Sequence, residues 1–483
     1  LLKAGTLGIA VTVLATLLPA REAAATPPLT TLSRAALEQA ARGRIRGLAG
    51  AGTVLLASGL LVALTAPGGV AGGFVGLFLL VIGAAMITPA VIHLAYRFPG
   101  SAAMPLLWRM GIRDLDRHLS RLGVAVAALM VALSAGVGVG VMVDSMRTAV
   151  DTWLDALLSA DLYVASAAHR DGAMLPADVV AGLSALPAVQ AASRYRHGSV
   201  RLLRRQVDLI GAHLSDPSRQ GFELLSGSAA ATWTAFDRGG VLISEPLAWH
   251  LGLERGAVLN LPTASASARF TVAGIFRDYA SEHGRIFMDE ASFLKHWPDA
   301  PVSSLALFAA GGDVGRLRRA LDAALPGRHD LAVTPASAIH EESLAVFDRT
   351  FRITGVLRAL LLIVAFIGVF GALMALQLER GKEFAVWRAL GMRRIQIAAL
   401  IGGESLVMGC VAACLAVPVG LLMAWLLVVS IQRRAFGWTM ALDIYPGVLL
   451  QVLLVGLAAA ALAAVYPLWR SASRDPAPLL REE

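Results

Sequence analysis

The stretch from Glu379 to Glu404 concentrates charged side chains between two long apolar runs. Its formal charges before the second run are Glu379, Arg380, Lys382, Glu383, Arg388, Arg393 and Arg394. A charged side chain at the centre of a bilayer costs about 3 kcal/mol or more, so these residues must lie in water at one face of a membrane. Charged side chains of this kind can form ion pairs with a partner protein, so the stretch is expected to be a contact surface.

Apolar side chains within the same stretch recur at helical spacing. Those that fall close to one stripe of a helix starting near residue 380 are Phe384, Trp387, Leu390 and Ile395. An amphipathic helix of this kind can lay its apolar stripe into a groove on a partner protein. Gly391 is expected to end or bend the helix, and the polar contacts that fix its register would come from Glu383, Arg388, Arg393 and Arg394. The alternative is a solvated basic helix beside the membrane that only sets the topology.

Other residues that could perform chemistry lack the spacing that the chemistry needs. The sequence contains no Gly-x-x-x-x-Gly-Lys-Ser/Thr loop, which indicates that ATP is not bound by a P-loop on this chain. Ser244, His250 and Asp278 could be imagined as a hydrolytic triad, but no Gly-x-Ser-x-Gly turn frames a serine. The glycines around Gly138 lie inside an apolar run without a preceding strand, and small residues there favour close helix contacts. We therefore expect neither catalytic nor metal-binding residues.

Composition indicates a membrane protein. The 483 residues are 57% hydrophobic and 16% charged, whereas soluble domains average about 25% charged. The formal net charge of +8 would suggest nucleic acid in a soluble protein. Here the arginines flank apolar runs, so the excess of cations on the cytoplasmic side of membrane proteins explains them better and no nucleic-acid partner is expected.

Seven stretches have the ~20 apolar residues that a membrane-spanning helix needs. They are residues 1–18, 47–66, 71–95, 121–143, 353–378, 402–430 and 446–469. The segments that connect them alternate between many cations and few. Residues 19–46, 96–120 and 379–398 are rich in arginine, whereas the short loop 67–70 has none. This alternation predicts that the basic segments and the C-terminus are cytoplasmic.

Residues 144–352 have the composition of a soluble domain and lie outside by the same alternation. Apolar strands are predicted at 161–165, 240–244 and 269–276. Helical patterns lie among them at 175–186, 245–254, 289–297 and 313–325. Strands mixed with helices indicate an α/β or α+β domain. The fold class is therefore an α-helical integral membrane protein, with about seven transmembrane helices and one extracytoplasmic α+β domain.

The two ends of the sequence resemble each other. Pro19, Pro28 and Leu32 recur at a constant offset as Pro467, Pro476 and Leu480, each set after a long apolar run. We interpret residues 1–46 as the last helix and cytoplasmic tail of an earlier copy of the unit that ends near residue 470. On this hypothesis the first half of the protein is truncated and would contain a second charged segment of the same kind. A signal peptide at residues 1–18 is the alternative.

The charged segment closely resembles the signature of FtsX-like ABC transporter permeases of the MacB and LolC type. Residues 240–256 and 272–279 also resemble the periplasmic core domain of MacB-type permeases, and the pair 47–96 resembles the linking helices of ten-helix, YbbP-like members. The resemblance implies a coupling helix at 379–401 that sits on an ATPase. Its ATPase-coupling residues would be Glu379, Arg380, Glu383, Phe384, Trp387, Arg388, Leu390, Gly391, Arg393 and Arg394.

The resemblance also orders the rest of the chain. The interfacial amphipathic helix would be 97–120, the extracytoplasmic MacB-like core domain 144–352, and two further transmembrane helices 402–470. The spans 121–143 and 353–378 would flank the core domain, and 471–483 would be a cytoplasmic tail. No cofactor is expected on this chain. ATP and Mg²⁺ would be bound by two separate ABC ATPase subunits, with membrane lipids and a periplasmic protein or hydrolase as further partners.

The function that follows from this resemblance is mechanical. A permease subunit in the bacterial inner membrane would transmit ATPase motion to the extracytoplasmic domain, and so extrude or release a lipoprotein, lipid or hydrophobic peptide. The alternative is a non-transporting FtsX-like regulator, in which the same movement activates an extracytoplasmic hydrolase or sensor. In neither case would this chain itself be an enzyme.

Overall fold

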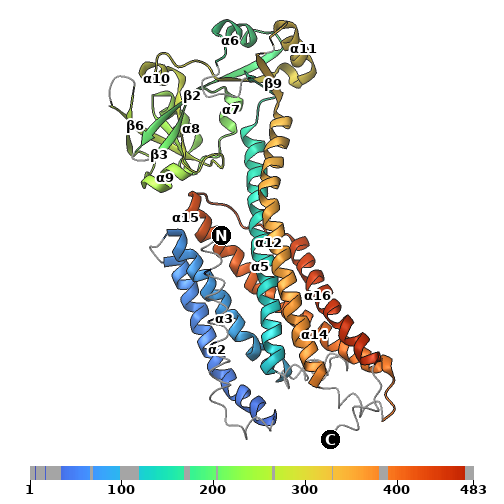
Figure 1. Ribbon diagram of the computed structural model, residues 1–483. Coiled ribbons are helices and arrows are strands. Elements are labelled where there is room, and N and C mark those ends of the chain that lie inside the picture. Colours follow the sequence, from blue (N-terminus) through green and yellow to red (C-terminus); the bar gives the residue numbers. More distant parts are fainter. Residues whose placement is uncertain are drawn as a thin grey trace.

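The structure, a computed structural model, describes most of the chain between residues 34 and 473. The described ranges are 34–65, 69–97, 119–167, 174–202, 205–263, 267–328, 330–379 and 390–473, with single helical positions at Thr6, Val13 and Leu17. The structure divides into a bundle of long helices and a sheet domain at one end of it (Figure 1).

The long helices are those expected of a membrane protein. They are α2 (Arg34–Thr65), α3 (Gly69–Arg97), α5 (Leu119–Leu157), α12 (Ala336–Glu379), α14 (Arg394–Leu426) and α16 (Pro446–Ser473). Six stretches within the described residues are long and apolar enough to cross a membrane: Ile45–Thr65, Gly69–Leu94, Leu122–Leu157, Ala336–Gly368, Ile395–Phe436 and Pro446–Val465. Each overlaps one of the seven predicted spans, although the bounds differ most for 353–378, which shares residues 353–368 with Ala336–Gly368. The seventh, 1–18, lies outside the described residues apart from its three single positions.

Two of these helices are much longer than the spans predicted from hydropathy. Helix α5 has 39 residues and α12 has 44; at 1.5 Å per residue they measure about 58 and 66 Å. A bilayer core is only about 30 Å thick. The predicted spans 121–143 and 353–378 are therefore parts of longer helices, whose outer portions we call the stalk. Figure 1 shows α5 and α12 side by side, rising from the bundle to the sheet domain.

The sheet domain occupies residues 162–335, within the predicted external region 144–352. Its nine strands have the order β5-β6-β4-β7-β3-β2-β8-β1-β9. Their bounds are β1 (Leu162–Ser166), β2 (Val189–Leu202), β3 (Arg205–His213), β4 (Val241–Ser244), β5 (Val258–Pro262), β6 (Ser267–Phe276), β7 (Arg285–Asp289), β8 (Ser304–Ala309) and β9 (Leu331–Pro335). Pairs β3–β7 and β4–β6 are parallel, whereas pairs such as β2–β3 and β1–β9 are antiparallel. The sheet is therefore mixed, with most of its pairs antiparallel.

Helices pack against the sheet in two groups, which divide the domain into two lobes joined by the long strand β2. The stalk lobe contains β8, β1 and β9 with α6 (Ala177–Ser184) and α11 (Val314–Ala324), around a core that includes Leu162, Leu183 and Leu321. The side lobe contains the strands from β5 to β3. Its helices are α7 (Asp216–Gln220), α8 (Ala229–Asp237), α9 (Glu245–Leu251) and α10 (Glu290–His296). In Figure 1 the stalk lobe stands above the stalk, and the side lobe lies beside it over the end of the bundle.

The stalk continues directly into the sheet. Strand β1 follows α5 closely, β9 ends where α12 begins, and the two strands pair in register from Leu162–Pro335 to Ser166–Leu331. The Asp161 carboxylate accepts a hydrogen bond from the Ala309 N–H at 2.7 Å, and its carbonyl accepts one from the Ala336 N–H at 3.2 Å. A displacement of α5 against α12 would therefore act on paired backbone strands.

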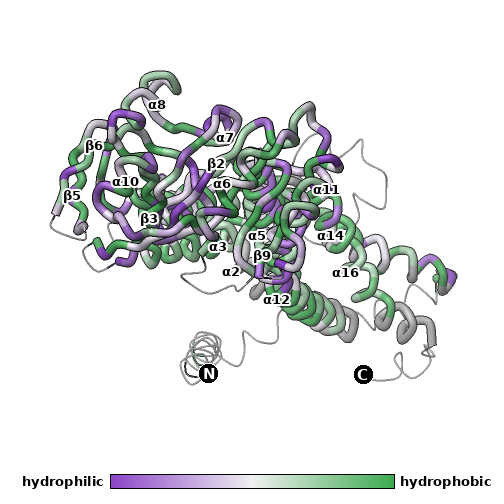
Figure 2. Tube along the Cα trace, turned by 90° about the horizontal axis from the view of Figure 1, so that it is seen from above, coloured by the Kyte–Doolittle hydropathy of each residue, from purple (hydrophilic) through white to green (hydrophobic). Residues whose placement is uncertain are grey.

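Small residues allow the membrane helices to pack closely. A Cβ added at Gly420 in α14 would lie 2.5 Å from the Val137 Cβ of α5, and one added at Gly138 would lie 2.9 Å from the Met423 Cβ. The prediction that glycines near residue 138 serve helix contact is confirmed. Seen from the side of the sheet domain, the membrane helices are mostly hydrophobic and the sheet domain holds much of the hydrophilic surface (Figure 2).

The close approach of α5 and α14 can be tested with two substitutions in one helix. Gly420→Ala should lower the thermal unfolding midpoint of the detergent-solubilised protein, because backbone must shift to admit the methyl group. Gly402→Ala is the matched control, since nothing lies within 4 Å of its Cβ position. Removing a glycine from a helix gains about 1 kcal/mol of helix propensity, so the control should be neutral or stabilising. Equal effects of the two changes would contradict the packing argument.

Candidate functional site: the junction of stalk, outer loop and sheet domain

The predicted coupling segment lies mostly outside the described residues. Arg380, Glu383, Phe384, Trp387 and Arg388 fall on 380–389, which the structure does not describe. Glu379 ends α12 and Arg394 begins α14. Arg393 is exposed, and its backbone N–H donates to the Gln396 Oε1 at 2.8 Å. The coupling role of these residues therefore stays a prediction.

The described end of this segment has the features of a free surface. Leu390 is 80% exposed and Ile395 is 74% exposed. Gly391 has φ +96°, a left-handed conformation that favours glycine, and nothing lies within 4 Å of its Cβ position. Since α12 runs away from the sheet domain and α14 returns toward it, the last residues of α12 and the first of α14 lie at the end of the bundle opposite the sheet domain (Figure 1).

A cluster of aromatic side chains joins three parts of the molecule at the end near the sheet domain. Tyr279 comes from the loop after β6, Trp153 from the stalk, and Trp438 from the outer loop, residues 437–445, which connects α15 (Arg433–Phe436) to α16. The ring of Tyr279 makes edge contacts with both tryptophans, at centroid distances of 5.9 Å to Trp153 and 5.6 Å to Trp438. Phe436 stacks on Trp438 at 4.8 Å. We call this cluster the junction.

Hydrogen bonds fix the register of the junction. The Tyr279 hydroxyl donates to the Thr439 carbonyl at 3.0 Å, and the Thr439 hydroxyl bonds the Glu245 carboxylate of α9. The Trp153 indole N–H donates to the Arg277 carbonyl at 3.2 Å. Burial raises the pKa of Tyr279 to about 12. Its hydroxyl therefore keeps its proton, and with it the donor role, throughout the physiological range.

The outer loop is also bound to the stalk. The Ser145 hydroxyl of α5 contacts both the carbonyl and the N–H of Asp443, at 3.2 and 3.1 Å. The Thr148 hydroxyl lies 3.0 Å from that of Tyr445. Between these two residues in α5, Arg147 forms a two-pronged ion pair with Asp348 of α12. One loop thus contacts the stalk on one side and the side lobe on the other.

The start of the outer loop requires glycine. Gly437 ends α15 with φ +79°, and a Cβ there would lie 2.9 Å from the Pro246 Cα of α9. A left-handed residue with no side chain lets α15 turn directly beneath α9. In the same helix, the Arg433 guanidinium lies 4.4 Å from the ring centroid of Trp249 in α9. This contact is a cation–π pair across the gap between the bundle and the sheet domain.

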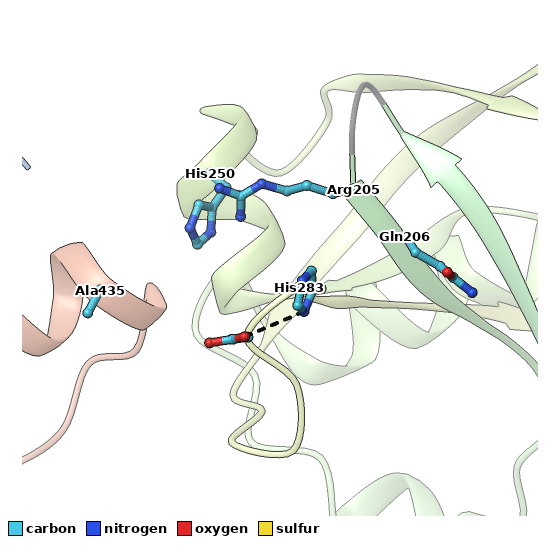
Figure 3. Close-up of a pocket in the computed structure, with 6 residues that line it drawn as sticks. Arg205, Gln206, His250, His283 and Ala435 are labelled. Atoms are coloured by element: carbon cyan, nitrogen blue, oxygen red, sulfur yellow. Dashed lines mark ion pairs between the residues drawn. The ribbon is translucent and has the colours of Figure 1, made fainter. Parts of the chain in front are cut away.

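A pocket of about 390 Å³ opens beside the junction. Its lining comes from the tip of the β2–β3 hairpin, α9, the loop before β7 and α15: Arg205, Gln206, His250, Glu282, His283 and Ala435. Figure 3 shows the Arg205 side chain reaching toward His250, with Ala435 facing them from across the gap. Because one wall belongs to the bundle and the others to the sheet domain, relative movement of the two bodies would change the size of this pocket.

The residues that could have suggested a hydrolytic triad have separate partners. Ser244 Oγ accepts from the Arg285 N–H at 2.8 Å, and His250 Nδ1 lies 2.7 Å from the Pro246 carbonyl. Asp278 Oδ1 accepts from the Ala280 N–H at 3.0 Å and lies 3.6 Å from Arg285 Nη1. Burial raises the pKa of Asp278, and the charge of Arg285 opposes that rise. These contacts brace the loop that carries Tyr279 and do not assemble a nucleophile.

Sequence reasoning did not find the junction. Tyr279 and Trp438 are distant in sequence, and each stands alone in its loop. The available signal was the sequence Phe436-Gly-Trp438 in a short loop after a membrane span, because buried aromatics with polar handles are frequent at contact surfaces.

Comparisons with known proteins match both parts of the chain. The MacB-like periplasmic core domain matches residues 122–324, and the FtsX-like permease C-terminal domain matches residues 355–476. An uncharacterized ABC transporter permease protein of Mycobacterium tuberculosis is 37% identical over 499 residues, which cover 100% of this chain and 58% of that protein. The chain thus spans a little over half of the length of this curated relative.

Two solved structures of extracytoplasmic regions align with part of this chain at low sequence identity. The periplasmic region of MacB from Actinobacillus actinomycetemcomitans aligns with 39% of this chain and 94% of its own, at 12% identity and a TM-score of 0.30. The extracellular domain of the ABC-type transporter YknZ from Gram-positive bacteria aligns with 36% of this chain and 98% of its own, at 10% identity and a TM-score of 0.26.

The junction predicts a specific effect of removing one hydroxyl. Tyr279→Phe keeps the ring contacts and loses the bond to Thr439, worth about 1 kcal/mol. Hydrogen–deuterium exchange of the outer loop should become severalfold faster. Tyr163→Phe, in the stalk lobe, is the control and should leave the loop unchanged. Exchange in the outer loop that does not change in Tyr279→Phe would contradict the assignment.

The same hydroxyl predicts a pH dependence with a defined sign. The folded-state pKa of Tyr279, about 12, lies above the ordinary tyrosine value of about 10. Its contribution to stability is therefore complete below pH 10 and is lost as the pH rises toward 12. Tyr279→Phe should remove this group's share of the alkaline loss of stability, measured by thermal unfolding at a series of pH values.

Proposed function

Because this chain belongs to the FtsX-like ABC transporter permeases that carry a MacB-like periplasmic core domain, we propose that it transmits ATPase motion to that domain mechanically. The single observation that carries the proposal is the continuity of α5 with β1 and of α12 with β9. Any shift between the two helices at one end of the bundle acts on paired strands at the other. A helix pair of this length behaves as a lever because its backbone hydrogen bonds are internal throughout.

We propose that the motion originates on a separate ABC ATPase, which docks at the turn between α12 and α14. Support comes from the absence of a P-loop in the sequence and from the exposed apolar side chains Leu390 and Ile395 at the described edge of this turn. The five cations of the coupling segment favour a cytoplasmic position for it. That orientation would place the sheet domain outside the bacterial inner membrane and the C-terminus in the cytoplasm.

The junction defines what would move. The stalk lobe is carried by α5 and α12, whereas the side lobe rests on α15 and the outer loop through Tyr279, Trp438 and Trp249. Tilting the stalk without α15 would shear these contacts and change the pocket beneath α9. A neutral hydrogen bond contributes about 1 kcal/mol net, and the bond from Thr439 to the Glu245 carboxylate contributes about 1.5 to 3 kcal/mol. With so few bonds, the junction can hold a resting state and still release. We propose that this rocking of the sheet domain is the output of the permease.

The cargo would be a hydrophobic or lipidic molecule released outside the bilayer, such as a lipoprotein, a lipid or a peptide. This part of the proposal rests on the resemblance to permeases of the MacB and LolC type. In that scheme the membrane helices need no continuous channel, because the sheet domain acts on cargo at the outer face.

The coupling assignment predicts the loss of one partner. Arg388→Glu combined with Gly391→Trp reverses a charge and places a large side chain on the docking surface. We expect this variant to lose the ATP-hydrolysing subunit that copurifies with the wild-type chain in affinity pull-downs from membranes. The expected loss is at least tenfold, which corresponds to about 1.4 kcal/mol.

A matched control exists at the other end of the molecule. Arg316→Glu with Gly311→Trp makes the same two changes in the sheet domain; Gly311 also has positive φ, +66°, and open space around its Cβ position. This control should retain the ATPase subunit. Unchanged association in the Arg388 and Gly391 variant would sink the coupling assignment, as would equal loss in the control.

A further inference from the structure

A groove on the side lobe gathers three arginines from three separate segments. Arg238 follows α8, Arg255 precedes β5, and Arg269 lies in β6. The groove has a volume of about 820 Å³ and lies between α8 and the β5–β6 edge of the sheet. We propose that it binds an acidic segment of a protein outside the membrane.

The positive charge of the groove is not neutralised within the domain. In the described part of the chain, none of the three arginines forms an ion pair, although carboxylates lie close by in sequence. Asp237, adjacent to Arg238, is held by Arg219 with N–O distances of 3.0 and 2.7 Å. Glu254, adjacent to Arg255, is exposed, and among the described residues its carboxylate forms no ion pair with any of the three arginines. The groove therefore keeps an excess of positive charge, and the three guanidinium groups remain available to an external anion.

One of the three side chains is held in position. The Arg255 Nε donates to the Ala273 carbonyl at 3.0 Å, and its guanidinium lies so close to Gly227 that a Cβ there would be 2.3 Å from Nη1. An arginine that is already ordered loses less side-chain entropy on binding a carboxylate. Arg238 and Arg269 are exposed and can adjust to the ligand.

The floor of the groove favours an extended peptide over a compact anion. Its lining between the arginines consists largely of small side chains, including Ala230, Thr234, Gly240 and Thr271. Small side chains let a ligand backbone approach closely, and the arginines would then pair with successive carboxylates along it. A lipid headgroup fits less well, because α9, and not α8 or β6, faces the end of the bundle (Figure 1).

The test uses the full chain in phosphatidylcholine nanodiscs and a fluorescein-labelled polyglutamate peptide as the probe. Fluorescence anisotropy should show saturable binding that weakens with salt, since exposed charge pairs are screened. Arg238→Gln/Arg255→Gln/Arg269→Gln should weaken binding about tenfold, because each exposed charge pair contributes only a small part of the affinity. Arg238→Gln/Arg269→Gln keeps the Arg255–Ala273 bond and should still lose severalfold, which separates lost contacts from misfolding.

Controls decide between this groove and general electrostatic attraction. Arg201→Gln/Arg316→Gln/Arg319→Gln removes the same charge from exposed positions elsewhere on the domain and should bind like wild type. Equal weakening in the two triple variants overturns the proposal, as does the absence of saturable binding. Displacement of the peptide by inorganic phosphate beyond that caused by chloride at the same ionic strength, or its loss in phosphatidylglycerol nanodiscs, would also overturn it, because the groove would then be a phosphate or headgroup site.

Discussion

Everything in this structure depends on the requirement that backbone polar groups be paired inside the lipid. A single segment that crosses the bilayer can pair all of its backbone N–H and C=O groups only by forming a helix. The same internal hydrogen bonds make the helix stiff. Helices α5 and α12 continue as helices beyond the thickness of a bilayer and end at the paired strands β1 and β9. The condition that lets them cross the membrane therefore also makes them suitable for carrying displacement to the sheet domain. Arg147 and Asp348 keep the two helices together above the apolar part.

The sheet domain is held at two places of different character. Its attachment to the stalk is covalent and strand-paired, whereas its attachment to α15 and the outer loop consists of side-chain contacts around Tyr279 and Trp438. The first cannot yield without breaking the sheet. The second can, because it consists of a few separate side-chain contacts, each worth about 1 to 3 kcal/mol, including the bond to the Glu245 carboxylate and the Arg433–Trp249 pair. In the proposed motion this asymmetry would make the side lobe the part that shifts relative to the bundle.

The sequence predicted those features of the fold that hydropathy and local pattern encode. Long apolar runs predicted the membrane spans, and short apolar runs predicted strands β1, β4 and β6. The ordinary composition of residues 144–352 predicted a soluble domain there. The helical extensions of α5 and α12 were missed because residues such as Asp151 and Asp155 resemble a soluble domain, although the helix continues through them. The β2–β3 hairpin was missed because Arg194, Arg196 and their polar neighbours hide its alternation; both arginines pair with Glu290. The junction depends on contacts between distant loops, which no local pattern reports.

The two arginines of α15 are an exception to the rule that cations concentrate in the cytoplasmic segments of membrane proteins. Arg433 and Arg434 lie at the end of the bundle near the sheet domain, where few cations are expected. Each is engaged: Arg433 lies over Trp249, and Arg434 donates to the Leu64 and Gly69 carbonyls at the end of α2 and the start of α3. The Leu64 carbonyl lies in the last turn of α2, where carbonyls have no hydrogen-bond donor within the helix, and a cationic side chain can supply that donor.

The same helix therefore links the sheet domain to the α2–α3 pair. Just before it, the chain widens into a π-helix, Leu427–Gln432, and Ser430 within it donates to the Ala63 carbonyl of α2. Glycines let α2 and α3 touch along their length: a Cβ at Gly76 would lie 2.5 Å from the Gly59 carbonyl oxygen. The pair is thus a stiff body attached to α15. In the proposed motion this pair would hold α15 in place while the stalk tilts, and the junction would be sheared because its support does not follow the stalk.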